Sequence, residues 1–494
     1  MLRSGSSMVP DTVSDSRDGD HRSSSIAFWG TVRNRNRRPL LSLVFFAAIA
    51  LFAATACGAR LDSAQYAAAV GANGTTAGER AARTTASGTN NQAATAGSGP
   101  TAADATAAAG AGGGGQAAAN TGGACTPEHV DTPGVTDTEI KLGNVSTISG
   151  PVPNFGATGR AGAKAYLDYV NSQGGVCGRK LTLVNADDRL DPGTNRASTE
   201  QLKDQVFGFV GNTSVEDDGG AAVIGGTNIP NCSLVIGSNA LTQPNYFSPN
   251  PIEPSGQTNG TTGIWRWFKA NKGITKVGLV YPDNPNAAGR VPAYVHDIQA
   301  AGLVADTPIK VAVTETNYVG VASQMKNNGD DAFITVLEVN GIAKFAQAIK
   351  QVGWQPKVPF FGAQAYGPQF PQLAGSAADG ALLGLTHDIV EGGSPAMQTF
   401  HDVYEASSSG QPLDFFAIMG WSAAKLCVDA IAAAGPAPTR DAVMQALNGV
   451  HDFTAGGILA PRDVAGRQPI AQFLVVTIEG GQWKRVFPDS GFAQ

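Results

Sequence analysis

Charged side chains are scarce in this sequence of 494 residues. Asp, Glu, Lys and Arg together make up 15% of it, and the formal net charge is −6. The C-terminal part carries no basic stripe, so the charge pattern argues against nucleic-acid binding. Apolar residues reach 42%, which is ample material for a core, and the length allows two or three domains.

Potential metal ligands are few and dispersed. The spacing of the cysteines fits no zinc-binding pattern. The six histidines are scattered along the chain: His21, His129, His296, His387, His401 and His451. We therefore expect neither a metal site nor a bound cofactor.

Motifs of common enzyme classes are missing. No G-x-S-x-G nucleophile elbow occurs. Gly156, Gly159 and Gly162 open a helix after a strand, and Asp187 lies near the end of the next strand. However, this G-x-x-G-x-x-G spacing differs from the G-x-G-x-x-G of dinucleotide sites, and a long loop replaces the tight turn. A secreted Rossmann-like enzyme is therefore the least favoured alternative, and we expect no catalytic residues.

The N-terminal region lacks an apolar run long enough to cross a membrane. The run from Leu40 to Ala53 has about 14 residues, whereas a membrane-spanning helix needs about 20. It follows a basic cluster, Arg33 to Arg38, in the arrangement of a signal peptide. We predict that residues 1–56 are a signal peptide and that the mature protein is extracytoplasmic.

Cys57 follows the small residues Ala54-Thr55-Ala56. This pattern resembles the lipobox of bacterial lipoproteins, in which the cysteine is acylated, although Ala54 stands where Leu is usual. The resemblance implies a lipid on Cys57 that anchors the protein to the cell membrane. The alternative is an ordinary signal peptide followed by an incidental cysteine.

Large apolar side chains are nearly absent between Ala59 and Gly123, where Ala, Gly, Thr, Ser and Asn dominate. Such a segment cannot offset the entropy lost on ordering. We therefore predict a disordered tether over residues 57–124.

From Thr136 onward the pattern changes to alternating strands and helices. An N-cap followed by proline, Asp191-Pro192, marks one helix start. This alternation predicts parallel sheets covered by helices on both faces, arranged as two α/β lobes. The predicted strands are 140–145, 180–185, 206–210, 233–237, 276–281, 331–337 and 358–362, and the predicted helices are 157–173, 192–203, 263–268 and 342–352.

Several segments in this part match one family in order and spacing. Ile140-Lys141-Leu142-Gly143, Ser149-Gly150-Pro151-Val152, Gly174 to Leu181, Gly208 to Gly211 and Gly420 to Ala424 together resemble the leucine/isoleucine/valine-type periplasmic binding proteins. The resemblance covers residues 136–494. It implies the type 1 periplasmic binding protein fold, with two Rossmann-like lobes joined by a three-strand hinge.

By position, this resemblance places lobe 1 at residues 125–257 and 388–465, and lobe 2 at 258–387 and 466–494. It implies a monomeric solute-binding protein that captures a small polar molecule between the lobes and delivers it to the permease of an ABC-type importer. A ligand-sensing domain that signals to a separate membrane receptor is the alternative.

Ligands of parallel α/β sheets sit beyond the carboxyl ends of the strands. In lobe 1 these loops hold short polar residues beside helix starts, which suit a ligand carboxylate. The family resemblance implies ligand donors at Thr213 and Ser214, although capping residues are of the same types. The other lobe 1 candidates are Phe155, Asn212, Ser238, Asn239 and Ala240. Phe155 aligns with an aromatic residue over the ligand, or it packs at the lobe edge.

In lobe 2 the corresponding loops contain Asp283, Gln364 and Tyr366. Family members that bind amino acids place a carboxylate near Gln364 for the ligand ammonium, and an aromatic residue near Ala287. Both are absent here. A buried ammonium without a paired carboxylate is costly, so we expect leucine, isoleucine and valine to bind poorly unless Glu338 or Asp283 replaces the missing group.

Two acidic clusters follow the second and third strands: Asp187-Asp188 with Asp191, and Glu216-Asp217-Asp218. We interpret the first as turn and capping residues rather than a metal site, and the second as favourable charge at a helix N-terminus.

Four cysteines remain in the folded part, and the sequence alone allows three pairings. In the implied fold, Cys125 and Cys177 both lie at the N-terminal edge of the lobe 1 sheet. Cys232 precedes the fourth strand, and Cys427 lies on a late helix of the same lobe. We therefore predict the disulfides Cys125–Cys177 and Cys232–Cys427.

Overall fold

A computed structural model describes residues 125–152, 155–252 and 256–494. The predicted signal peptide, the predicted tether and the predicted acylation site at Cys57 lie outside these residues.

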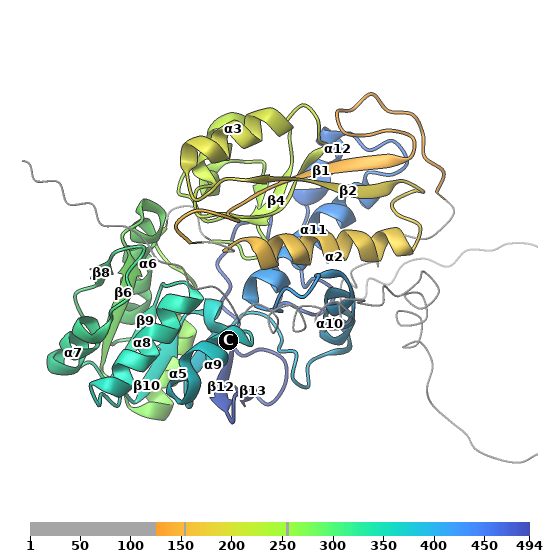
Figure 1. Cartoon of the computed structure of the whole chain (residues 1–494). Helices are drawn as coiled ribbons and strands as arrows, with labels where there is room; N and C mark the ends of the chain where they lie inside the picture. Colours follow the sequence, from red (N-terminus) through yellow and green to blue (C-terminus); the bar gives the residue numbers. More distant parts are fainter. Residues whose placement is uncertain (1–124, 153–154, 253–255) are drawn as a thin grey trace, which may run out of the picture. The chain divides into compact units, whose positions relative to one another are not determined.

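The first lobe is built on a five-stranded parallel sheet in the order β2-β1-β3-β4-β5. Figure 1 shows α3 on one side of this sheet and α2 with α11 on the other. The strands are β1 (Glu139–Ser146), β2 (Lys180–Asp187), β3 (Gly208–Thr213), β4 (Asn231–Leu234) and β5 (Tyr246–Phe247). The helices are α2 (Ala157–Ser172), α3 (Pro192–Leu202), α4 (Asp218–Ile224), α10 (Pro395–Ser407), α11 (Phe415–Ala433) and α12 (Arg440–Leu447), with the 3-10 turn η1 (Ala240–Thr242).

The second lobe is built on an eight-stranded sheet in the order β13-β12-β11-β10-β9-β6-β7, with β8 also paired to β6. It is parallel except at β12, which runs antiparallel to both β11 and β13. The strands are β6 (Lys276–Pro282), β7 (Val304–Ala305), β8 (Ile309–Val311), β9 (Ala332–Thr335), β10 (Val358–Phe361), β11 (Leu382–Leu385), β12 (Leu474–Glu479) and β13 (Gln482–Phe487). The helices are α5 (Thr262–Lys272), α6 (Pro285–Ala300), α7 (Val319–Asn328), α8 (Val339–Gln351) and α9 (Gln369–Ala374), with η2 (Ala363–Ala365) and η3 (Gly375–Ala377).

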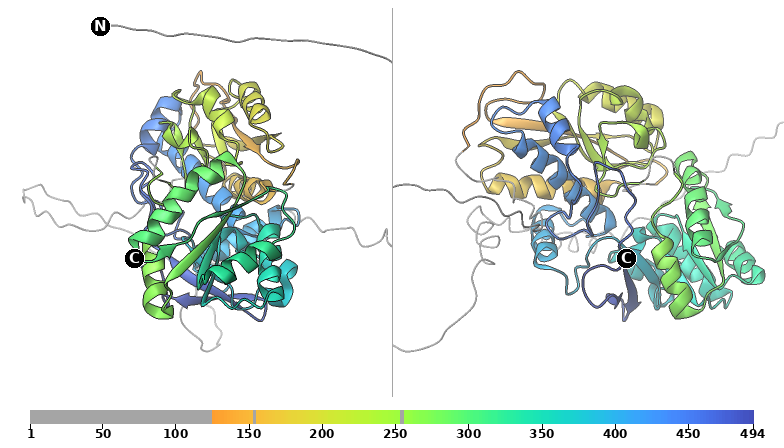
Figure 2. Two further views of the ribbon diagram at one scale, coloured as in Figure 1. Left: turned by 90° about the vertical axis from the view of Figure 1, so that its left-hand side faces the viewer. Right: turned by 180° about the vertical axis from the view of Figure 1, so that it is seen from behind.

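The chain passes between the two sheets three times: between β5 and α5, between β11 and α10, and between α12 and β12. Figure 2 shows that the C-terminal part of the chain contributes to both lobes, with α11 beside the first sheet and β12–β13 at the edge of the second. The second and third crossings are joined by backbone hydrogen bonds. The Ala460 amide donates to the Thr386 carbonyl at 3.0 Å, and the Asp388 amide donates to the Ile458 carbonyl at 2.7 Å. The predicted fold class, two α/β lobes with parallel sheets, is confirmed.

Close packing of α2 against α11 explains the glycine spacing in α2. A Cβ on Gly162 would lie 2.0 Å from the Ala417 carbonyl oxygen, and a Cβ on Gly420 would lie 1.9 Å from that of Gly159. A Cβ on Gly156 would lie 2.5 Å from the Thr213 carbonyl oxygen. The G-x-x-G-x-x-G motif therefore lets two backbones approach each other, which is a packing role.

Helix α11 is the core helix of the first lobe. It has 19 residues with a mean hydropathy of 1.5, and it is the one helix among the described residues that is long and apolar enough to cross a membrane. However, 83% of this apolar window is buried inside the fold. Its apolar character therefore serves the core, where Trp421 packs edge-on against Tyr166 of α2 with ring centroids 4.9 Å apart.

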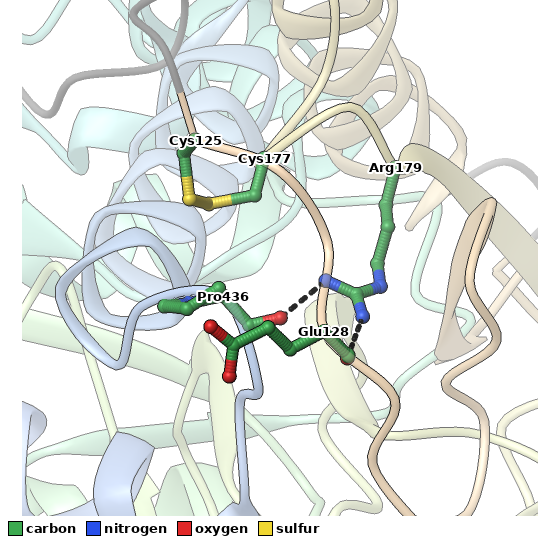
Figure 3. Close-up of a disulfide and its surroundings, with 5 residues drawn as sticks. All are labelled: Cys125, Glu128, Cys177, Arg179 and Pro436. Carbon is green, nitrogen blue, oxygen red and sulfur yellow. Dashed lines mark hydrogen bonds between the residues drawn. A yellow bond between two sulfur atoms is a disulfide. The ribbon is translucent and has the colours of Figure 1, made fainter.

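The described N-terminal segment is fastened to lobe 1 beside the sheet (Figure 3). Cys125 forms a disulfide with Cys177, with their Cα atoms 4.7 Å apart, so this predicted pair is confirmed. The buried guanidinium of Arg179 donates to the carbonyls of Glu128 at 2.5 Å and Pro436 at 2.7 Å. The amide of Glu128 also donates to the Pro436 carbonyl at 3.0 Å. These contacts join the segment both to the start of β2 and to the loop between α11 and α12.

The second predicted disulfide is wrong. Cys232 on β4 and Cys427 on α11 are both free and fully buried. The fold does bring them near each other, because Cys427 contributes to the electrostatic environment of the Cys232 thiol. Burial, and then the neighbouring Cys427, raise the pKa of the Cys232 thiol well above its usual value. A thiolate is needed for disulfide exchange, so burial disfavours the reactive form of Cys232.

Candidate ligand-binding site

A cavity of about 320 Å³ lies between the lobes. Most side chains that line it are apolar, and they come from both lobes and from the crossing segments. From lobe 1 they include Val152, Phe155, Val215, Leu234, Ile236 and Phe416; from lobe 2, Ala287, Tyr318, Ile334, Phe360 and Phe361; and from the crossings, Pro251, Ile252 and Ile470. The polar residues include Asn250, Asn259, Thr261, Asn284, Arg290, Thr335, Glu338, Gln364, Thr386 and Gln472.

Phe155 lies at the cavity, as expected from the sequence. Its ring packs against Phe416 at the start of α11, with ring centroids 4.8 Å apart and planes tilted by 59°. The half-buried ring thus lines the cavity and also packs at the edge of lobe 1.

The predicted donors at the end of β3 do not line the cavity. Thr213 and Ser214 are each 1% exposed and belong to the interior of lobe 1. The Ser214 hydroxyl oxygen accepts the Glu216 amide at 2.9 Å, which is a turn contact. The side-chain oxygen of Asn212 accepts the Val145 amide at 3.0 Å and so bridges β3 and β1. These three residues stabilise the carboxyl end of the sheet.

The loop after β4 is bound by two carboxyl groups of the protein itself. The Ile236 and Gly237 amides donate to Asp217 at 2.9 and 2.7 Å, and the Ala240 amide donates to Asp218 at 2.9 Å. A Cβ at Gly237 would lie only 2.1 Å from an Asp218 oxygen, so the loop can approach these carboxyl groups only because this residue is glycine.

Asp217 is buried, and burial raises its pKa to about 7 against the effect of the two amides. The acidic cluster does lie at the start of α4, as interpreted from the sequence, but Asp217 and Asp218 accept hydrogen bonds from the neighbouring loop. The other candidates there lie outside the cavity lining, because Ser238 and Asn239 are exposed and Ala240 is buried.

In lobe 2, Gln364 lies on η2 and lines the cavity, whereas the other two candidates do not. Tyr366 is a core residue: its hydroxyl donates to Glu391 at 3.2 Å and accepts the Val390 amide at 2.8 Å. Asp283 is 60% exposed and forms an ion pair with Lys310 at 3.2 Å. The sequence suggested Asp283, Gln364 and Tyr366 as ligand-binding residues because each follows a predicted strand.

Glu338 is the one acidic residue among the described residues of the lining. Its carboxylate caps α8, accepting the Asn340 amide at 2.7 Å and the Gly341 amide at 2.5 Å. This group is therefore already bound by the helix N-terminus. Asp283 lies outside the lining, so of the two groups that could replace the missing carboxylate only Glu338 reaches the cavity.

Arg290 of α6 is the one cationic residue among the described residues of the lining. It is 8% exposed, and its guanidinium donates to the side-chain oxygen of Asn259. The side-chain nitrogen of Asn259 is buried and has no hydrogen-bond partner. Tyr294, one turn further along α6, also faces the cavity. Sequence reasoning missed Arg290 because it lies inside a helix and not in a strand-end loop.

Contacts across the cavity join the first turn of α6 to lobe 1. Asn284 caps α6 by accepting the Asn286 and Ala287 amides at 2.9 and 3.2 Å, and its amide donates to Glu216 of lobe 1 at 2.9 Å. Asn286 donates to the Val215 carbonyl. Burial raises the pKa of Glu216. The Asn284-Pro285 pair repeats the pattern of Asp191-Pro192, so the same signal could have located this cap.

The first acidic cluster supports the loops beside the cavity. Asp187 accepts the amides of Ile148 and Arg189, both at 3.0 Å, and the hydroxyl of Ser149 at 2.5 Å. Although burial opposes ionisation, these hydrogen bonds lower its pKa to about 2. Asp191 caps α3, as interpreted from the sequence. No group of three or more side chains that could hold a metal occurs within the described ranges.

The fold and the cavity define a two-lobed binding protein in which a ligand would lie between parallel α/β sheets. A family model described as periplasmic binding protein matches residues 139–482, so the chain belongs to this family. Its members are binding proteins, which confirms the prediction that the chain is not an enzyme.

Relatives and solved structures agree at low sequence identity. The chain is 24% identical over 323 residues to the leucine-, isoleucine-, valine-, threonine- and alanine-binding protein of Pseudomonas aeruginosa, covering 60% of this chain and 79% of that protein. A fatty acid ABC transporter substrate-binding protein from Thermomonospora curvata has a TM-score of 0.64 at 19% identity, covering 72% of this chain and 93% of that one. A branched-chain amino acid ABC transporter protein from Thermus thermophilus, with bound valine, has a TM-score of 0.62 at 18% identity, covering 71% and 95%.

Proposed function

We propose that this chain is the extracytoplasmic solute-binding component of an ABC-type importer. The observation that carries the proposal is the cavity of about 320 Å³, lined by both lobes and by the crossing segments, in a member of the periplasmic binding protein family. A site between two lobes can enclose a small molecule when they close, and the closed form then docks on the permease.

We further propose the lobe boundaries and the anchoring implied by the sequence. Lobe 1 comprises residues 125–257 and 388–465, and lobe 2 comprises 258–387 and 466–494. The signal peptide ends before Cys57, whose lipid anchors the chain, and residues 57–124 form the tether. The proposal is supported by the elements themselves, since β1–β5 with α10–α12 and β6–β13 with α5–α9 fall into these ranges.

The test is a thermal-shift screen of the purified protein against a panel of small metabolites. A ligand that binds the native state at 100 times its dissociation constant stabilises it by about 2.7 kcal/mol. We expect one class of compounds to raise the melting temperature in a saturable manner. If no compound in a broad panel does so, the solute-binding proposal is wrong.

Leucine is predicted to be a poor ligand. The cavity offers Gln364 where a carboxylate would be needed, and Glu338 is bound as a helix cap. Losing the partner of a buried charge costs about 2–5 kcal/mol. Isothermal titration should therefore give a leucine dissociation constant far above the micromolar range. A value at or below micromolar would contradict our interpretation of Gln364.

A further inference from the structure

The cavity has an apolar wall and a polar wall. Among the described residues, every lining side chain of lobe 1 outside the crossing segments is apolar, for example Phe155, Leu234 and Ile236. The polar side chains of the lining, such as Glu338 and Gln364, belong to lobe 2 and to the crossing segments. An inference from this division rests on the proposed function, because it names the chemical class of the solute.

The loop of lobe 1 that follows β4 uses its backbone donors within the protein. The amides of residues 236, 237 and 240 donate to Asp217 and Asp218. Lobe 1 therefore presents mainly apolar groups to a solute at this loop. Covering such a surface is favourable when the part of the solute that lies against it is apolar as well.

Asn259, in the first crossing segment, carries an unsatisfied hydrogen-bond donor at the cavity. The residue lines the cavity, and its side-chain nitrogen is buried without a hydrogen-bond partner. No other buried side-chain nitrogen or oxygen of the described lining lacks a partner. Leaving a buried donor unsatisfied is unfavourable, so an acceptor on the solute would stabilise the complex at this atom.

Two contacts hold Asn259 in place. Its backbone amide donates to Asp297 of α6 at 3.0 Å, and its side-chain oxygen accepts the guanidinium of Arg290. A guanidinium has donors only, so the oxygen end of the Asn259 amide must face it and the nitrogen end must face away. Arg290 thus determines which end of the amide is left for the solute, and this role requires no contact between Arg290 and the solute. A donor held in place before binding loses little side-chain entropy when the solute binds.

We propose that the solute is an amphiphile whose apolar body lies against lobe 1 and whose polar end presents a hydrogen-bond acceptor, such as a carbonyl oxygen, to the side-chain nitrogen of Asn259. The first crossing segment and lobe 2 thus select the polar end, and lobe 1 binds the apolar body. An ammonium group elsewhere on the polar end is compatible with this site, because Glu338 also belongs to the polar wall.

Isothermal titration with 2-octanone and octylamine tests the polar end. The ketone carries an acceptor and no donor, whereas protonated octylamine carries donors and no acceptor. Asn259→Asp keeps the oxygen that accepts from Arg290 and replaces the donor with a second acceptor. This change should weaken 2-octanone binding roughly 10- to 100-fold, and it should not weaken octylamine binding. Asn271→Asp makes the same chemical change at an exposed position of α5 and should leave both affinities unchanged.

A series of ketones tests the apolar body. Each methylene added between 2-pentanone and 2-octanone should tighten binding roughly fourfold, which is the transfer free energy of one buried methylene expressed as an affinity. Ile236→Asn places a polar group on the wall of lobe 1 and should reduce this gain. Val304→Asn, at an exposed apolar position of β7, should leave it unchanged. Circular dichroism shows whether each variant is folded.

Three results would overturn the proposal: 2-octanone binding that Asn259→Asp leaves unchanged, equal losses for 2-octanone and octylamine, or an affinity that does not rise along the ketone series. If 2-octanone does not bind the wild type, the solute class is wrong. The thermal-shift screen then decides separately whether the cavity binds any solute.

Discussion

Single buried groups in this protein have shifted pKa values, and His387 shows the consequence most clearly. It lies in the second crossing, is fully buried, and shares a hydrogen bond of 2.7 Å between its Nδ1 and the Asp388 carbonyl. Burial, with a smaller effect of the nearby Arg462, lowers its pKa to about 4, although the hydrogen bond to the Asp388 carbonyl opposes this shift. Its ring packs against Tyr366 with centroids 4.9 Å apart. The histidine is therefore neutral in the folded protein at neutral pH.

This state makes folding stability depend on pH. The unfolded chain binds the proton of His387 near pH 6.5, whereas the folded chain binds it only near pH 4. The contribution of neutral His387 to the free energy of unfolding is thus complete above pH 6.5. It is lost as the pH falls toward 4, by up to about 3 kcal/mol. Urea unfolding between pH 6.5 and 4 should show that the free energy of unfolding falls more for the wild type than for His387→Phe. The exposed His129→Gln is the control, and parallel curves for wild type and His387→Phe would contradict the prediction.

At the residue scale the sequence correctly indicated Phe155 and Gln364 as cavity residues, but it could not indicate Asp217 or Arg290. Asp217 hydrogen-bonds to amides 19 and 20 residues away, which only the paired strands bring close. Arg290 reaches the cavity because of the direction of α6, and no local pattern encodes that direction.

At the scale of elements, the first turn of α6 holds the two sides of the cavity together. Asn284 caps this helix and hydrogen-bonds to Glu216 of lobe 1. Asn284→Ala should lower the free energy of unfolding by about 1 kcal/mol through the lost cap alone. Asn284→Ser keeps a capping oxygen but cannot reach Glu216, so it should retain most of the cap contribution. Urea unfolding measures the difference.

A double-mutant cycle isolates the contact across the cavity. We expect Asn284→Ser and Glu216→Ala to show a coupling energy of at least about 0.5 kcal/mol, as is usual for residues in contact. Additive effects of the two changes would mean that the hydrogen bond does not link the lobes in solution.

The predictability of the elements followed their length and their apolar pattern. Long segments such as β1, α2 and α8 were predicted with nearly correct bounds because their periodicity is strong. β3 begins at Gly208 and extends to Thr213, three residues beyond the predicted end, since Asn212 and Thr213 are polar yet buried. β7 and β8 were not predicted because strands of two or three residues leave no clear pattern. The hairpin of β12 and β13 was also missed, although β12 is an apolar strand of six residues that is paired on both sides.

For the molecule as a whole, the disulfide Cys125–Cys177 closes a loop of 52 residues in sequence separation. Such a crosslink stabilises a protein mainly by restricting the unfolded chain, typically by about 2–4 kcal/mol. We expect the double variant Cys125→Ser, Cys177→Ser to unfold at a correspondingly lower urea concentration. A reducing agent should destabilise the wild type to the same extent.

The same experiment tests the state of the other two cysteines. Because Cys232 and Cys427 are free, a reducing agent should have no effect on the double variant. A further loss of stability on reduction would reveal a second disulfide in this part of the chain and contradict the structure.

The core helix α11 also has a consequence for biosynthesis. A chain that crosses a membrane in extended form presents Phe415–Ala433 to the translocation channel before any partner helix covers it, and this stretch has the length and hydropathy of a membrane anchor. Lys425 and Asp429 are charged residues within it, and in the folded protein they pair at 2.8 Å. Each opposes lateral release into lipid by about 2.5–3.5 kcal/mol near the middle of a span. The two charged residues of this ion pair would thus keep the polypeptide moving through the channel.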